Sequence, residues 1–452
     1  MENKLDDQAW TCVVPHTKQE KKNMKNNSFT GNLGILVGGG PAPGINGVIA
    51  AATIEARRNK LAVYGLQHGY KWLVRESEKD FNDHVRELRI SDVSRIHFDG
   101  GSILFTSRTN PTKIPGGVDN AVKHLKSLGI RYMITIGGDD TAYGAVEISR
   151  AAKGEIKFAH VPKTIDNDLP LPNNLPTFGY QTARNLGATL VKNLMEDART
   201  TDRWYIVVAM GRSAGHLGLG IAKSAGATLA IISEEFPQKK KISLESVCDV
   251  IEGAILKRRA MGHNHGVVVI AEGVALRLDE KELKKSRRGE FKYDHFGNPL
   301  LSEIDLGKII KSNIERRFEK RGDNRQLVDI NIGYVLRCAD PIPFDQEYTR
   351  DLGYNAVRYL LSSNPRHKQN AMICVDNGRL IPLYFKDIID PDTKKTAVRL
   401  VDTTSESYQV ARSYMVRLEK RDFEDEAFIQ SLAKGSNMSV STFIKRFGHL
   451  GK

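Results

Sequence analysis

Cysteine is scarce in this chain of 452 residues, which has only four. They are Cys12, Cys248, Cys338 and Cys374, and no two of them stand in a Cys-x-x-Cys pair. Such scattering argues against a disulfide framework and against a cysteine-rich zinc site. A reducing, cytoplasmic compartment is therefore the expected location.

Long hydrophobic runs are missing as well. Residues 1–30 are polar and hold no apolar segment of the signal-peptide kind, so we interpret them as a flexible N-terminal extension. The most membrane-like stretch is Leu217–Ser233, but Lys223 and three glycines interrupt it. Because a membrane-spanning helix needs about 20 mainly apolar residues, we expect neither a signal peptide nor a membrane span.

What the chain does have is an ordinary globular composition with a basic excess. Hydrophobic residues make up 40% and charged residues 27%, which excludes disorder or a fibrous repeat as the main architecture. The length predicts two or three domains, or one large two-lobed unit. The net charge of +13 fits either a nucleic-acid binder or an enzyme with polyanionic substrates, and composition does not separate the two.

Three basic runs contribute to this excess, at residues 239–241, 284–288 and 316–325. We interpret all three as solvated faces. The basic residues do not alternate with aromatic ones, as a surface for single-stranded nucleic acid would require. A nucleic-acid-binding protein on the same scaffold therefore stays a distant alternative.

Short apolar runs alternate with helical patterns along most of the chain. Strands are predicted at residues 33–37, 61–66, 132–136, 157–161, 204–210, 228–232 and 266–271, and helices at 45–60, 141–152 and 181–199. This alternation predicts an α/β fold with parallel sheets that are covered on both faces. In such folds ligands bind at the carboxyl ends of strands, where each motif described next is located.

Two glycine loops follow predicted strands. The first is GGGPAPG at residues 38–44, and it is neither a Walker A loop nor a GxGxxG fingerprint. It suits close approach of a phosphate to a helix N-terminus, or else a tight structural turn. The second is GGDDT at residues 137–141, where a carboxylate beside a phosphate can hold Mg²⁺. Asp140 could equally serve as a helix N-cap or first-turn acid.

The heptapeptide PKTIDND at residues 162–168 carries the most chemistry. A lysine, a hydroxyl group and two carboxylates, those of Asp166 and Asp168, fall within it. Phosphoryl transfer to an alcohol needs a base near the hydroxyl and cations near the transferred group. The alternative is a loop that its own Asx turns stabilise. Met210-Gly211-Arg212 ends a further predicted strand, where the arginine suits a phosphate or carboxylate or else is a surface charge, and Gly211 beside it indicates close approach of a ligand. Glu272 and Arg108 lie near a strand end or glycines, and each fits a surface position about as well as a functional one.

Taken together, these motifs resemble the phosphofructokinase family. The resemblance runs from Leu33 to about Asp345 and rests on GGGPAPG, GGDD, PKTIDND and MGR in the family's order. NAD kinases and lipid kinases share part of the first two motifs but lack TIDND followed by MGR. The resemblance implies two Rossmann-like parallel-sheet lobes with the active site in the cleft between them. One lobe, for the phosphate donor, spans residues 31–177 and is completed by about 336–390, and the fructose 6-phosphate lobe spans 178–335 and is completed by 391–452.

The activity that the resemblance implies is Mg²⁺-dependent phosphoryl transfer to the 1-hydroxyl group of fructose 6-phosphate. Asp166 matches the catalytic base, and Asp139 matches the carboxylate linked to Mg²⁺. Residues that match assisting catalytic groups are Lys163, Thr164, Asp168 and Arg212. Residues that match donor-phosphate contacts are Gly39, Arg108, Asp140 and Lys163. Residues that match sugar-phosphate contacts are Thr164, Asp166, Arg203, Met210, Gly211, Arg212, Glu272, Tyr334 and Arg337. Arg203 matches an arginine that reaches into a neighbouring subunit, which implies a homodimer or homotetramer.

Asp140 bears on the identity of the phosphate donor. Members of the family that use ATP typically have GGDG, in which the glycine leaves space for the α-phosphate. A carboxylate at this position fills that space and repels a third phosphate group. The sequence therefore resembles the pyrophosphate-dependent branch, in which Lys163 adds a cation near the transferred or leaving phosphate. An ATP-dependent 6-phosphofructokinase of the same fold is the alternative.

Three positions depart from the family pattern. Pro41 stands where many members have an acid, and Tyr334 replaces the histidine of the short ATP-dependent enzymes. Their second cross-subunit arginine corresponds to Val328 here, with Arg325 close by in the sequence. The tail from about Asp390 onward has no role that the sequence assigns.

Overall fold

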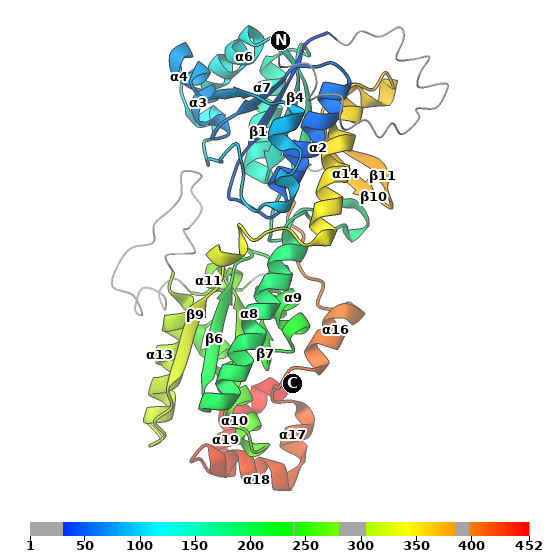
Figure 1. Ribbon diagram of the computed structural model, residues 1–452. Coiled ribbons are helices and arrows are strands. Elements are labelled where there is room, and N and C mark those ends of the chain that lie inside the picture. The colour runs from blue at the N-terminus through cyan, green and yellow to red at the C-terminus, as the bar shows by residue number, and fades with distance from the viewer. Residues whose placement is uncertain (1–29, 238–239, 280–303, 386–396, 452) are drawn as a thin grey trace. The chain divides into compact units, whose positions relative to one another are not determined.

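The computed structural model describes residues 30–237, 240–279, 304–385 and 397–451 (Figure 1). The chain divides into two compact units. Unit 1 comprises Met1–Ile165, Leu169–Thr182 and Arg337–Ala397, and unit 2 comprises Asp166–Asp168, Ala183–Leu336 and Val398–Lys452. The three residues Asp166–Asp168 thus cluster with unit 2, whereas the ranges expected from the sequence put them in the donor lobe. The backbone contacts of Asn167 and Asp168 with Arg399 of unit 2 account for this grouping.

Unit 1 is built on a seven-stranded sheet with the strand order β11-β10-β5-β4-β1-β2-β3. The strands are β1 (Asn32–Val37), β2 (Val63–Leu66), β3 (Val85–Glu87), β4 (Ile130–Gly137), β5 (Lys157–Pro162), β10 (Ala371–Asp376) and β11 (Arg379–Tyr384). The five central strands are parallel, which confirms the predicted α/β fold. The two edge strands β3 and β11 are antiparallel and were not expected from the sequence.

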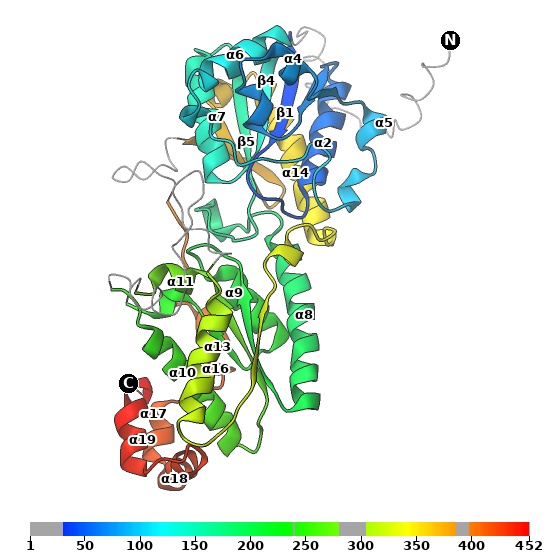
Figure 2. The same ribbon diagram turned by 90° about the vertical axis from the view of Figure 1, so that its left-hand side faces the viewer.

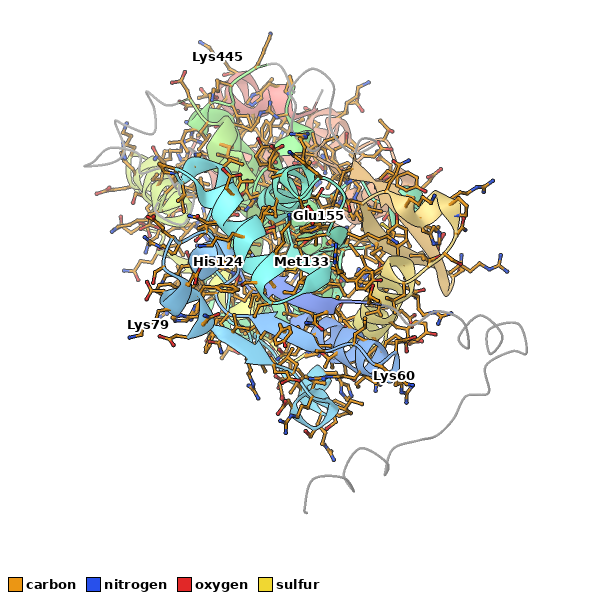
Figure 3. All side chains as sticks on the ribbon, turned by 90° about the horizontal axis from the view of Figure 1, so that it is seen from above. Lys60, Lys79, His124, Met133, Glu155 and Lys445 are labelled. Atoms are coloured by element: carbon orange, nitrogen blue, oxygen red, sulfur yellow. The ribbon has the colours of Figure 1, made fainter. Side chains whose placement is uncertain are left out.

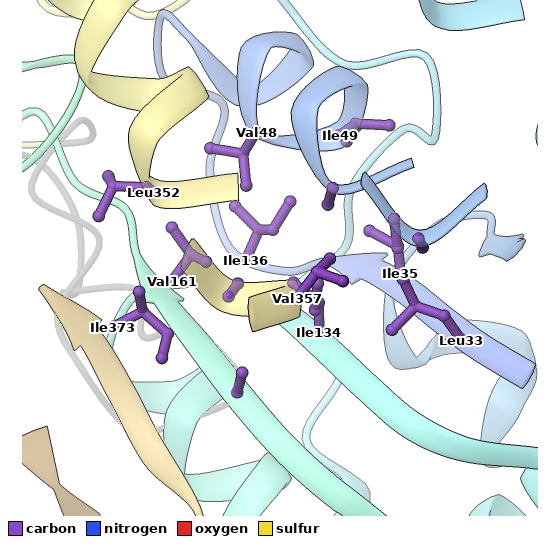
Figure 4. Packing of buried hydrophobic residues seen from close by; sticks show 14 of the residues in the cluster. Leu33, Ile35, Val48, Ile49, Ile134, Ile136, Val161, Leu352, Val357 and Ile373 are labelled. Atoms are coloured by element: carbon purple, nitrogen blue, oxygen red, sulfur yellow. The ribbon is translucent and has the colours of Figure 1, made fainter. Parts of the chain in front are cut away.

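Helices cover both faces of this sheet. On one face, α2 (Ile45–Arg58) and α14 (Pro343–Leu360) pack against each other and against the strands (Figure 2). Figure 4 shows Val48 of α2 and Val357 of α14 gathered with Ile35 and Ile134 of the strands. On the other face, α3 (Tyr70–Leu73), α6 (Gly117–Ser127) and α7 (Asp139–Ala151) bury a second cluster that contains Leu36. Neighbouring residues of β1 therefore face opposite cores, which is why the whole strand is apolar.

Unit 2 contains a four-stranded parallel sheet with the order β7-β8-β6-β9. Its strands are β6 (Trp204–Ala209), β7 (Leu229–Ile231), β8 (Gly266–Ala271) and β9 (Leu327–Asn331). Its helices are the greater part of α8 (Tyr180–Thr201), with α9 (His216–Ala225), α10 (Leu244–Ala260), α11 (Gly273–Arg277), α13 (Leu306–Glu319), α16 (Glu406–Ser413), α17 (Lys420–Glu424), α18 (Glu426–Gly435) and α19 (Val440–Phe447). Among the helices that the structure describes, none is long and apolar enough to cross a membrane.

The interpretation of the basic run at 316–325 as a solvated face is wrong for three of its arginines, of which Arg325 is 14% exposed and pairs with Asp323. Arg317 and Arg321 are only 14% and 12% exposed, and both form ion pairs with Glu252 of α10 at 3.0 and 2.5 Å. Arg446 of α19 reaches the same carboxylate at 2.9 Å. Because Glu252 is completely buried, its charge needs such cationic partners. Part of the basic excess therefore holds α13 and α19 onto α10.

Other lysines do lie in solvent. Lys60 and Lys79 are exposed and extend away from the ribbon in Figure 3. The run at 284–288 and Lys239 lie outside the described residues, as does the extension at residues 1–29.

Candidate active site

In unit 1, the glycine loop that follows β1 lies directly against the loop that follows β4. The N–H group of Gly38 donates to the carbonyl of Ile136 at 2.9 Å, and that of Gly39 donates to Ser107 at 2.9 Å. A Cβ atom at Gly38 would come within 2.3 Å of Oγ1 of Thr141. Glycine is therefore required for the two loops to approach this closely, which agrees with a phosphate-binding role and with a tight turn alike.

A buried lysine lies beside this loop. The side chain of Lys163 is 4% exposed, and its Nζ atom donates to the carbonyl of Gly40. A Cβ atom at Gly39, whose φ is +81°, would stand 3.1 Å from that same Nζ atom. The backbone N–H of Lys163 donates to Gly137 at 2.8 Å, which ties β5 to the end of β4. The structure thus brings together three expected donor-site elements: Gly39, Lys163 and the GGDD loop.

Two arginines accompany the glycine loop. The guanidinium group of Arg337 lies so close to Gly40 that a Cβ atom there would be 1.9 Å from Nη2. Arg337 belongs to unit 1, whereas Tyr334, which the resemblance assigns to the same sugar-phosphate group, belongs to unit 2. Arg108 is exposed and directly follows Ser107, whose carbonyl binds Gly39.

The two acids of GGDD begin α7. Gly138 is the N-cap residue and has no side chain to cap the helix, so Asp139 and Asp140 are first-turn acids. Negative charge in a first turn interacts favourably with the helix dipole. Both residues are half-buried, and Oδ1 of Asp139 is shielded from solvent. In the part of the chain that the structure describes, no three His, Cys, Asp or Glu side chains gather to hold a metal ion by themselves.

A histidine that was not predicted as a site residue supports the GGDD loop. His160 of β5 is completely buried, and its Nε2–H donates to the carbonyl of Gly137 at 3.0 Å. Its Nδ1 atom accepts from the hydroxyl of Thr135 at 2.9 Å. Burial lowers the pKa of His160 to about 3, so the ring is neutral and both nitrogens keep these roles at physiological pH. A histidine within an apolar strand was the only signal in the sequence.

In unit 2, expected site residues meet where β6 and β8 end. Met210-Gly211-Arg212 follows β6, and Glu272 follows β8, with its N–H bound to Ala209 at 2.8 Å. Oε1 of Glu272 accepts from the N–H groups of Gly211 at 3.1 Å and Arg212 at 2.9 Å. Neighbouring strand ends of a parallel sheet are the usual ligand-binding edge.

Charges of both signs meet at this edge. Nε of Arg212 lies 3.9 Å from Oδ2 of Asp166, and Arg212 has the left-handed φ of +49°. Burial, together with the negative charge of Asp166, raises the pKa of Glu272 to about 7. Left-handed backbone in a non-glycine residue costs free energy and is often found at functional sites. The structure therefore joins Asp166, Arg212 and Glu272 in one cluster.

The end of β9 adjoins the same edge. A Cβ atom at Gly333 would come within 2.4 Å of Cγ of Met210, so the methionine packs over this glycine. Tyr334 follows directly and is 59% exposed. Its ring is thus available at a strand end, as the resemblance implies for a sugar-phosphate contact.

Arg203 lies away from this cluster within unit 2. It precedes β6, whereas Met210 follows it, so about 20 Å of extended strand separates the two. Arg203 lines a pocket of about 340 Å³ together with Asp323 and Arg325. The structure therefore places Arg203 and Arg212 at opposite ends of one strand.

The TIDND segment is divided between the units. Thr164 belongs to unit 1, where its carbonyl accepts from the hydroxyl of Thr177 at 2.7 Å. Asp166 and Asp168 belong to unit 2, and between them Asn167 has a left-handed φ of +56°. Arg399 binds this segment, and it belongs to the tail for which no role was predicted.

Comparison with known proteins gives consistent results. A family profile described as phosphofructokinase matches residues 32–360. The chain is 53% identical over 417 residues to a pyrophosphate–fructose 6-phosphate 1-phosphotransferase of Thermotoga maritima, with 92% of this chain and 98% of that protein covered. It is 48% identical over 424 residues to a pyrophosphate–fructose 6-phosphate 1-phosphotransferase of Naegleria fowleri, with 92% and 95% covered.

A solved structure agrees at the level of the fold. The crystal structure of a pyrophosphate-dependent phosphofructokinase from Marinobacter aquaeolei matches with a TM-score of 0.59 and 16% sequence identity. The match covers 86% of this chain and 92% of that one.

Proposed function

Because the chain belongs to the phosphofructokinase family, we propose that it transfers a phosphoryl group from pyrophosphate to the 1-hydroxyl group of fructose 6-phosphate. The products are fructose 1,6-bisphosphate and phosphate, and the reaction is reversible. The observation that carries the choice of acceptor is the cluster of Asp166, Arg212 and Glu272 at the strand ends of unit 2. It combines a carboxylate base with a cation and a half-buried acid, which suits a sugar that carries both hydroxyl groups and a phosphate.

In the proposed chemical step, Asp166 acts as the base. Its carboxylate takes the proton of the 1-hydroxyl group as that oxygen attacks the terminal phosphorus of pyrophosphate. The new O–P bond forms as the bond to the bridging oxygen breaks, and the bridging oxygen leaves with the departing phosphate. Arg212, whose Nε atom lies 3.9 Å from Oδ2 of Asp166, places a cation beside this carboxylate.

Lys163 and the glycine loop receive the donor. The buried ammonium group lies beside Gly39 and Gly40, where the backbone leaves room for phosphate oxygens. A cation fixed in a site of low dielectric stabilises charge that accumulates on the transferred and leaving groups. Arg337, stacked against Gly40, and the neighbouring Arg108 add positive charge at the same loop.

Asp140 selects pyrophosphate over ATP. It is a half-buried acid in the first turn of α7, beside the loops that receive the donor. A third phosphate group next to it would clash with the side chain and would be repelled by its negative charge. This single position supports pyrophosphate rather than the ATP-dependent alternative, and the names of the two relatives at 53% and 48% identity agree with it.

The residues present fit Mg²⁺ as a cofactor bound together with the donor. Asp139 supplies a half-buried carboxylate, and Mg²⁺ takes its remaining oxygen ligands from water and phosphate rather than from a protein cage. Bound Mg²⁺ would neutralise charge on the donor oxygens. Asp139 is the residue that would hold it.

We further propose a homodimer or homotetramer. Arg203 lies at the opposite end of β6 from Met210 and Arg212, so it does not share their cluster within unit 2. Its position suits an arginine that serves the sugar-phosphate site of a second copy. Arg325, which lines the same pocket, adds a cation next to it.

The test of the proposed function is product analysis by ³¹P NMR. Purified protein with fructose 6-phosphate, Mg²⁺ and pyrophosphate is expected to form fructose 1,6-bisphosphate and phosphate in equal amounts. The reverse reaction, from fructose 1,6-bisphosphate and phosphate, should regenerate pyrophosphate. Turnover with ATP and none with pyrophosphate would contradict the donor assignment.

A further inference from the structure

Arg399 makes an unusually dense set of contacts with the segment that carries the proposed base. Its guanidinium group donates from Nε at 3.1 Å and from Nη2 at 3.0 Å to the carbonyl of Asn167, and Nη2 also donates to Oδ1 of the same residue. The backbone N–H of Arg399 donates to the carbonyl of Asp168 at 2.7 Å. One residue of the tail thus binds both residues that follow Asp166.

We propose that Arg399 is a positioning residue for phosphoryl transfer, because it fixes the backbone turn that aims Asp166 and Asp168. This inference rests on the proposed function, in which Asp166 is the base. The contacts above join Arg399 to Asn167 and to the backbone of Asp168. It acts through Asn167, the residue between them.

The conformation of Asn167 explains why contacts that hold its backbone are needed. Its φ of +56° lies in the left-handed region, which is unfavourable for most non-glycine residues, although asparagine tolerates it better than most. Such a conformation persists only where surrounding contacts hold it. The planar guanidinium group binds the Asn167 carbonyl through two nitrogens at once, which a lysine ammonium group does not reproduce.

The same tail segment also reaches the loop that carries Arg212. Nε2 of His216, at the start of α9, donates to the carbonyl of Arg399 at 3.1 Å. Oε1 of Glu234 accepts from Val401 at 3.1 Å and from Gly215 at 2.7 Å, so one buried carboxylate joins the tail to the β6–α9 loop. Residues 399–401 therefore connect the loop of Asp166 with the loop of Arg212, and the 3.9 Å pair between those two residues depends on both loops.

Two substitutions at this position measure the effect. Arg399→Ala is expected to lower kcat on the order of 10–100-fold, the cost of a small misplacement of a catalytic group, while KM for fructose 6-phosphate changes by less than about threefold. Arg399→Lys should recover little of the loss, because it cannot bind the carbonyl with two nitrogens. Added guanidinium or ethylguanidine at non-denaturing concentration should restore part of the activity of Arg399→Ala but not that of the lysine variant.

The matched control is Arg421→Ala, which removes another arginine of the tail. The Arg421 side chain is 80% exposed and pairs with Glu419 at 2.7 Å, so its removal should leave kcat unchanged. A third variant, Asn167→Gly, adopts the left-handed turn without strain. In that background Arg399→Ala should cost less in kcat than in the wild type.

Several outcomes would overturn the proposal. An unchanged kcat in folded Arg399→Ala would do so, and so would equal losses in the wild-type and Asn167→Gly backgrounds. Parallel falls in kcat and Tm that lysine restores together would assign Arg399 to tail docking alone. If Arg399→Ala does not fold, Arg399→Lys replaces it. The loss in kcat that Arg399→Lys causes is then compared between the wild-type and Asn167→Gly backgrounds.

Hydrogen exchange separates this proposal from the proposed function. Peptides covering residues 164–169 should exchange faster in Arg399→Ala than in the wild type, whether or not pyrophosphate is turned over. If the wild type lacks the activity but exchange in this segment is faster in Arg399→Ala than in the wild type, the proposed function fails and the positioning contact is still supported. Unchanged exchange in this segment would overturn the positioning role even in an active enzyme.

Discussion

The half-buried carboxyl group of Glu272 accepts a hydrogen bond from the backbone N–H of Arg212 at 2.9 Å, so a side chain after β8 holds the loop after β6. Burial and the nearby charge of Asp166 raise the pKa of this carboxyl group from 4.5 to about 7. A half-buried acid thus lies where the proposed sugar-phosphate site needs a fixed backbone. Its ionisation falls within the physiological pH range.

The raised pKa of Glu272 has a consequence for stability. Between pH 4.5 and about 7 the folded state binds more protons than the unfolded state, so the contribution of Glu272 is present below pH 4.5 and is lost as pH rises through 7. The free energy of unfolding of the wild type, relative to Glu272→Gln, should fall by at most about 3 kcal/mol between pH 4.5 and 8. Urea titrations over this range measure the difference, and a constant gap between the two proteins would refute the assignment.

Gly39→Ala should damage the donor site. Alanine is strained at φ +81°, and its Cβ atom would crowd Nζ of Lys163 at 3.1 Å, so KM for pyrophosphate should rise and kcat should fall. Gly154→Ala is the matched control, since Gly154 has φ +82° but no atom within 4 Å of the added Cβ. Both variants should lose similar stability. Equal kinetics in the two variants would argue against a donor role for the Gly39 loop.

Asp140→Gly should weaken the exclusion of ATP, because it removes both volume and charge beside the donor loops. We expect measurable ATP turnover from this variant, or from the double variant with Lys163→Gly, together with a lower kcat for pyrophosphate. Asp119→Gly removes an exposed first-turn acid from α6 and serves as the control for lost helix stability, about 0.3–1 kcal/mol from the dipole interaction alone. If neither Asp140 variant binds ATP, another residue controls the donor.

Asp166→Asn should remove the base while it keeps the size of the side chain. The expected loss in kcat is about 10²–10⁴-fold, with KM for fructose 6-phosphate little changed. Glu196→Gln, which neutralises an exposed acid paired with Arg199 on α8, is the control and should behave as the wild type does. A kcat within a few-fold of the wild-type value in Asp166→Asn would rule out this role.

Most of the parallel strands could be predicted from the sequence, because apolar runs such as that of β1 end in glycines, but β9 and β10 were not among the predicted strands. The edge strands β3 and β11 could not, since antiparallel pairing at an edge leaves little pattern in three to six residues. The role of Arg399 could not be predicted, because 232 residues separate it in the sequence from Asn167, its hydrogen-bond partner. Arg317 looked like a surface charge because its buried partner Glu252 lies 65 residues earlier in the sequence.

The most direct test of the central claim is the ratio of kcat/KM for pyrophosphate to kcat/KM for ATP, measured on the wild-type protein with saturating fructose 6-phosphate and Mg²⁺. A ratio above about 100 is expected, since one half-buried carboxylate that repels a third phosphate is worth discrimination of that order. A ratio below one, with ATP as the better donor, would contradict the account.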